Sequence, residues 1–190
     1  MPTEYNFEYF FNKTCSIWGE LKHPNRIIPF CTPLIMHPKF LVIGTNHSDN
    51  FDPHDECENK RIADDFSKTI PEEEHTFIDH NHPFAKGLRS IETEIQKIYP
   101  EFKVTRDWVG TNRCAIQTDS SGLKSVTEYD KYEDCQEKMD VLLRNFISFC
   151  KPKNVILTGL HACKLYYSER TLEDMKCKRI LSNDSDATCN

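Results

Sequence analysis

The chain has 190 residues, of which 38% are hydrophobic, and it carries nine cysteines and a formal net charge of −6. This length can bury one sizeable core, so we expect a single globular domain over residues 1–190. The negative charge argues against a broad basic face that coats nucleic acid, and the scattered, odd-numbered cysteines without a CxxC pair fit neither a zinc ribbon nor a closed disulfide framework.

The sequence also lacks the patterns of a membrane span and of a secretion signal. No apolar run approaches the length of a membrane span, and the N-terminus lacks the basic and apolar segments of a secretion signal. We therefore expect a cytoplasmic or nuclear protein that is not secreted and makes no contact with a membrane.

The first half of the chain leads to one strand with a polar exit. Residues 1–30 are rich in aromatic side chains and are expected to contain a helix that packs on a sheet. The apolar run FLVI at 40–43 predicts a buried strand, and it runs directly into the polar sequence GTNHSDN. Residues 49–82 form an acidic excursion, with eleven Asp or Glu between 49 and 79. Because α/β proteins place ligands at the carboxyl ends of parallel strands, the exit of this strand is the first candidate site.

The second half alternates helices and strands. The expected elements are a helix over 83–98, a strand over 104–109 with a polar segment at 110–114, a helix over 131–150, a strand over 155–157, a helix over 160–167 and a short strand over 179–181. This alternation predicts an α/β fold with three layers, in which helices cover both faces of a central, mostly parallel four-stranded sheet.

The order of these parts resembles the uracil-DNA glycosylase superfamily. The motifs that carry the likeness are GTNHS after the first strand, Thr111-Asn112 at the second, KPKNVILTGLHA around the third and a late loop with Asn and Ser. The likeness is to members whose first motif is Gly-x-Asn-Pro, although His47 stands where proline is usual. The resemblance implies a uracil-DNA glycosylase-like fold and a monomeric enzyme that flips a deaminated or modified base out of DNA and hydrolyses its N-glycosidic bond.

The resemblance also implies roles for individual residues. Asn46 would orient the attacking water, and His47 places a titratable group beside it. Asn112 would read the polar edge of the flipped base, which Gly44 and Thr45 would also line. Phe84 would stack on the base, with Phe77 as the alternative. The implied or candidate DNA contacts are Ser48, Arg113, Asn183 and Ser185, together with Lys86, Arg89 and Lys124.

Three other interpretations remain open at this point. Cys114 and Cys135 lie near positions where some members of the superfamily hold an iron–sulfur cluster, but cysteines at helical core positions also serve as small hydrophobic residues. A metallohydrolase would use carboxylates and histidines of the acidic segment, namely His47, Asp49, His54, Asp55, His75, His80 and His82, yet no fixed ligand spacing occurs there. We expect no metal and no cofactor. The non-enzyme alternative is a glycosylase-fold binding module that reads a modified base or mimics DNA.

Overall fold

The computed structural model describes residues 5–46, 67–71, 83–118 and 123–167, excluding the side chains of 83–88 and 104–105. The elements that it places are α1 (Phe7–Gly19), β1 (Phe40–Gly44), α3 (Pro83–Gln96), α4 (Val104–Asp107), β2 (Trp108–Asn112), α5 (Lys124–Thr127), α6 (Tyr132–Cys150), β3 (Asn154–Leu157) and α7 (Leu160–Cys163). Within these ranges, no helix combines the length and apolarity needed to span a membrane.

The three strands form one parallel sheet in the order β2-β1-β3. Phe40 at the start of β1 lies opposite Trp108 on one side and Asn154 on the other, and Gly44 at its end lies opposite Asn112. The predicted α/β class with a parallel sheet is therefore confirmed. The predicted fourth strand, residues 179–181, lies outside the described part of the chain.

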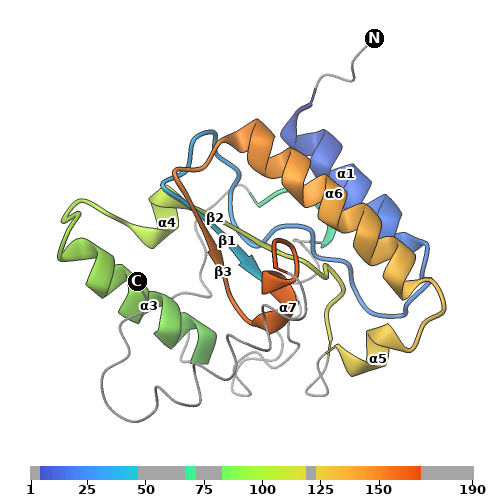
Figure 1. Cartoon of the computed structure of the whole chain (residues 1–190). Helices are drawn as coiled ribbons and strands as arrows, with labels where there is room; N and C mark the ends of the chain where they lie inside the picture. The colour runs from blue at the N-terminus through green and yellow to red at the C-terminus, as the bar shows by residue number, and fades with distance from the viewer. Residues whose placement is uncertain (1–4, 47–66, 72–82, 119–122, 168–190) are drawn as a thin grey trace.

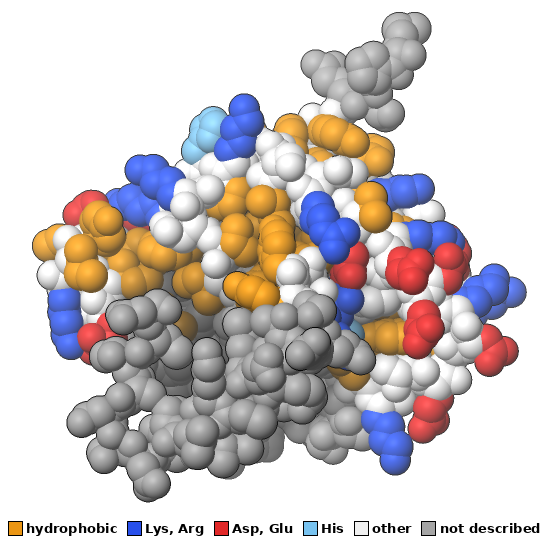
Figure 2. Space-filling view, viewed as in Figure 1, with side chains coloured by type: hydrophobic (Ala, Val, Ile, Leu, Met, Phe, Trp, Pro, Cys, Tyr) orange, Lys and Arg blue, Asp and Glu red, His pale blue; other side chains and the backbone are white. Residues whose placement is uncertain are grey.

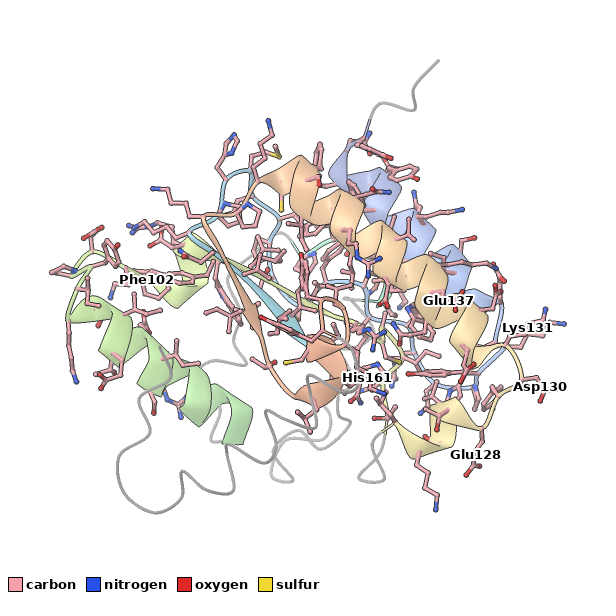
Figure 3. The ribbon with its side chains drawn as sticks, in the orientation of Figure 1. Phe102, Glu128, Asp130, Lys131, Glu137 and His161 are labelled. Carbon is pink, nitrogen blue, oxygen red and sulfur yellow. The ribbon has the colours of Figure 1, made fainter. Side chains whose placement is uncertain are left out.

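Helices lie on both sides of the sheet (Figure 1), and alternate residues of β1 belong to two different core clusters. Leu41 and Ile43 of β1 belong to the core cluster that also contains the buried side chains of α1 and α6. Val42 faces the other way and packs with Trp108 and with Phe102, which lies between α3 and α4 (Figure 3). This two-residue alternation is what a strand covered on both faces requires.

The helices α1 and α6 lie side by side over the first face (Figure 1). The ring of Phe146 on α6 packs against Phe10 of α1 at a centroid distance of 5.1 Å and against Phe30 at 5.2 Å. The apolar spacing along 131–150 correctly predicted α6, and the expected N-terminal helix is confirmed as α1. These aromatic contacts fix α6 against the sheet, and the inner face of α6 becomes one wall of the site described below.

Two predicted boundaries were wrong. The strand predicted over 104–109 begins only at Trp108, because residues Val104–Asp107 form the short helix α4. The Asp107 carboxylate accepts a hydrogen bond from the Lys103 backbone N–H at 2.9 Å and pairs with Arg106 at 2.7 Å, which stabilises a helical turn. The helix predicted over 160–167 is also shorter, since α7 ends at Cys163 and single turns follow.

Candidate functional site at the carboxyl edge of the sheet

The strand order reverses at β1. From β1 the chain passes through α3 to β2, and from β2 it passes through α6 to β3 on the opposite side of β1. The helices α3 and α6 lie on opposite faces of the sheet (Figure 1). Such a reversal opens a crevice outside the strand ends, which is where open α/β sheets bind ligands.

Gly44 and Asn112 meet at this edge. They are partners in the β1–β2 register, and the Asn112 carboxamide oxygen lies so close to the Gly44 Cα that a side chain on Gly44 would overlap with it. Asn112 is buried, so its carboxamide packs over the end of β1 instead of extending into solvent. Glycine is thus the residue that allows Asn112 to occupy this position.

Asn46 follows two residues after β1, and its amide nitrogen donates a hydrogen bond to the hydroxyl of Thr118. Thr118 is fully buried and lies in a segment held against residues 25–28 by backbone bonds. Ile28 N–H donates to Ala115 O at 2.7 Å, and Gln117 N–H donates to Arg26 O at 2.9 Å. The carboxamide of Asn46 is therefore oriented by a rigid partner.

The exit of β3 completes the edge. Thr158 donates its backbone N–H to Ile43 O at 2.9 Å, which extends the β1–β3 pairing by one residue. Thr45 donates its hydroxyl to Thr158 O at 3.4 Å and lies against Gly159, whose φ of 87° is in the region that favours glycine. All three strand exits therefore converge on the residues Gly44, Thr45 and Asn46.

A buried ion pair lies directly behind this edge. The Arg113 guanidinium, which follows Asn112, donates through Nε to Asp140 Oδ1 at 2.7 Å and through Nη2 to Asp140 Oδ2 at 2.6 Å. Its Nη1 donates to the backbone oxygen of His161 at 2.9 Å. The two charged side chains are only 8% and 13% exposed, so the predicted DNA contact residue Arg113 faces inward in this structure.

Gln136 of α6 connects the ion pair to His161 of α7 (Figure 3). The Gln136 amide nitrogen faces two acceptors, Arg113 O at 3.2 Å and Asp140 Oδ1 at 3.1 Å. Its oxygen therefore accepts from Tyr132 OH at 3.2 Å and lies 3.1 Å from His161 Nε2. Because that oxygen can only accept, Nε2 of a neutral His161 carries the hydrogen, and Nδ1 is the basic nitrogen.

The same surroundings keep His161 neutral. Burial first, and then the positive charges of Arg113 and Lys164, lower the pKa of His161 from its ordinary value of 6.5 to about 4, although the Asp140 carboxylate acts in the opposite direction. Burial also raises the pKa of Tyr132 well above its usual range. The network is therefore uncharged near neutral pH except for the Arg113–Asp140 pair.

The lowered pKa of His161 predicts a specific loss of stability in acid. An unfolded chain protonates this imidazole near pH 6.5, whereas the folded chain resists protonation down to about pH 4. The contribution of neutral His161 to the free energy of unfolding is complete above pH 6.5 and is lost as the pH falls from 6.5 to about 4. The free energy of unfolding of the wild type should therefore fall more steeply between pH 6.5 and 4 than that of His161→Gln, as measured by urea unfolding. Parallel curves for the two proteins would contradict this.

The other predicted site residues are placed as follows. Lys124 on α5 is exposed and Arg89 on α3 is partly exposed. The remaining predicted site residues lie outside the described part of the chain: His47, Ser48, Phe77, Asn183, Ser185, the residues of the acidic segment at 49–66 and 72–82, and the side chains of Phe84 and Lys86. The structure thus brings together Gly44, Thr45, Asn46 and Asn112 from the predicted set.

The cysteines that were candidates for an iron–sulfur cluster, Cys114 and Cys135, are buried in the core. Burial raises the pKa of Cys114 to about 12 and also raises that of Cys135, whose thiol donates to Ile17 O at 3.2 Å. Among the residues that the structure describes, no group of three or more His, Cys, Asp or Glu side chains could hold a metal ion. High thiol pKa values disfavour the thiolate form that a metal or cluster requires.

Sequence reasoning missed several residues of the site. They are the anchor Thr118 and the network residues Tyr132, Gln136, Asp140 and His161. A signal for part of this set was present, because Tyr132, Gln136 and Asp140 are spaced four residues apart and so lie on one face of a helix. Comparison of the chain with protein-family models, with curated proteins and with solved structures gives no match.

Proposed function

We propose that the chain is a DNA glycosylase that hydrolyses the N-glycosidic bond of a deaminated or modified base. The observation that carries this proposal is that Asn112 packs over Gly44 at the carboxyl edge of the sheet, while Asn46 lies two residues beyond that glycine with its amide bonded to Thr118. Each carboxamide offers one hydrogen-bond acceptor and an amino group that donates, and both lie where the strand order of the sheet reverses.

The two carboxamides have different tasks in this mechanism. Asn112 pairs with the polar edge of a base that has been flipped out of the stack. Asn46, held by Thr118, orients a water molecule toward the anomeric carbon of the sugar. The carbon–nitrogen bond breaks with its electrons leaving on the base, the water oxygen bonds to the sugar, and the proton that the water gives up is taken up by the departing base. The products are a free base and an abasic site.

The fold that we propose around this site is uracil-DNA glycosylase-like, with a fourth strand beside β3. Figure 2 shows hydrophobic side chains gathered over the middle of the described surface, and Val155 of β3 and Leu160 of α7 are exposed. In the described sheet β3 is an edge strand, so its side away from β1 is where a further strand would pair. The candidate for the fourth strand remains the segment 179–181.

The test is an abasic-site assay on DNA duplexes and single strands that carry uracil, hypoxanthine, mismatched thymine or modified cytosines. The chain should release one base and leave a site that alkali cleaves. Asn46→Ala, purified in parallel, should not release it, which separates this activity from a contaminating glycosylase. Absence of release from every substrate would overturn the proposal.

The second candidate is a module that binds a base or DNA without cutting it. The inward orientation of Arg113 favours it, because recognition of a single base at Asn112 does not use this cation, whereas placing a target nucleotide for cleavage uses cations that face the phosphates. A binding module would release no base in the abasic-site assay. In a filter-binding assay it would retain one of the same DNA substrates, and the Asn46→Ala variant would retain that DNA as well as the wild type does.

A further inference from the structure

The buried network ties together three segments that border the candidate site. Arg113 belongs to the exit of β2, Asp140 and Gln136 to α6, and His161 to α7 after β3. We propose that the Arg113–Asp140 pair is a positioning device for Asn112, so that Asp140 sets base discrimination without touching the base. The role in base discrimination rests on the proposed function, whereas the contacts that hold Arg113 do not depend on it.

Arg113 is held at every polar group that it has on the main chain and side chain. Its backbone N–H donates to Gly44 O at 2.9 Å, and its backbone oxygen accepts from Gln136 at 3.2 Å. Its guanidinium is fixed by both oxygens of Asp140. Asn112 is the last residue of the β1–β2 ladder and Arg113 follows it directly, so the anchoring of Arg113 holds the end of the strand on which Asn112 lies.

The side chain of Asn112 depends on that backbone. Its oxygen lies directly over Gly44, and a small rotation of the strand end would move it off the glycine. A bidentate guanidinium–carboxylate pair resists such rotation better than a single hydrogen bond, since two parallel bonds fix a plane. A displaced carboxamide still fits in the site, but it no longer matches one base edge better than another.

The first variant is Asp140→Asn, which keeps the size of the side chain and removes its charge and one acceptor. The matched control is Asp134→Asn, an exposed aspartate on the same helix that pairs with Lys138. We measure excision of the preferred base and of the next best base by each protein. The ratio of the two rates should fall roughly 10- to 100-fold in Asp140→Asn and stay unchanged in Asp134→Asn. An unchanged ratio in both would overturn the proposal.

A second variant separates positioning from stability. Arg113→Met combined with Asp140→Leu replaces the buried pair with apolar side chains, an exchange that often preserves or restores stability. If the pair positions Asn112, this double variant should recover the unfolding midpoint of the wild type while discrimination stays low. Recovery of discrimination together with stability would assign the pair a purely structural role.

A third readout needs no catalysis. In ¹⁵N-labelled protein, the side-chain amide resonances of Asn112, assigned by their loss in Asn112→Asp, should shift or broaden in Asp140→Asn and remain unchanged in Asp134→Asn. If the wild type releases no base but these resonances respond as expected, the proposed function fails and the positioning role stands. If the wild type is active while the resonances and the discrimination ratio stay unchanged, the positioning role fails and the function stands.

Discussion

Asp140→Ala is expected to lower the free energy of unfolding by about 3–5 kcal/mol, because it leaves the Arg113 guanidinium buried without its carboxylate. Gln136 Nε2 also loses one of its two acceptors, although the backbone oxygen of Arg113 remains. For a chain of this size, such a loss corresponds to a fall in melting temperature of roughly 6–20 °C. Thermal and urea unfolding of the variant and the wild type measure it.

The control for this prediction is Asp134→Ala on the same helix. Its carboxylate pairs with Lys138 at 2.7 Å, but the Asp134 side chain is 60% exposed, so water replaces the lost contact. The unfolding midpoint of this variant should be close to that of the wild type. If the two variants unfold at the same midpoint, the Arg113–Asp140 pair does not have the energetic weight that its burial implies.

The regular elements could be predicted where the apolar period was long or uninterrupted. The nineteen residues of α6 repeat their apolar positions through five turns, and the run 40–43 is apolar without a break, so both were found from the sequence. The start of β2 could not be found in this way. Val104 and Val109 suggest an extended segment, but Asp107 stabilises a helical turn through Lys103 and Arg106, and this choice depends on side-chain bonds.

Only part of the candidate site could likewise be predicted from the sequence. Asn46 and Asn112 were predicted because each follows or ends a strand, and parallel strands bring their carboxyl ends to one edge. Thr118 was not, since it reaches Asn46 across 72 positions of sequence. Asp140 and Gln136 were missed because they border the apolar stripe of α6, where polar residues usually face solvent. Arg113 was predicted as a phosphate contact because sequence shows its charge but not its partner.

Asn46→Ala is expected to slow single-turnover excision by roughly 100- to 1,000-fold while leaving DNA affinity nearly unchanged. In the proposed mechanism the carboxamide positions the water and does not hold the base, so its loss would remove an interaction made mainly in the transition state. Rapid-quench measurements at saturating enzyme give the rate, and fluorescence anisotropy with a labelled duplex gives the affinity.

Two further variants locate the origin of this effect. Thr118→Val keeps the shape of the buried anchor but removes the oxygen that accepts from Asn46, so it should give a smaller loss of rate than Asn46→Ala. Asn12→Ala exchanges an exposed asparagine on α1 and should leave the rate unchanged. A rate for Thr118→Val equal to the wild type would mean that the orientation of Asn46 does not depend on Thr118. An equal loss of rate and affinity in Asn46→Ala would instead make Asn46 a base-binding group, because the bound base and the transition state would then rely on it alike.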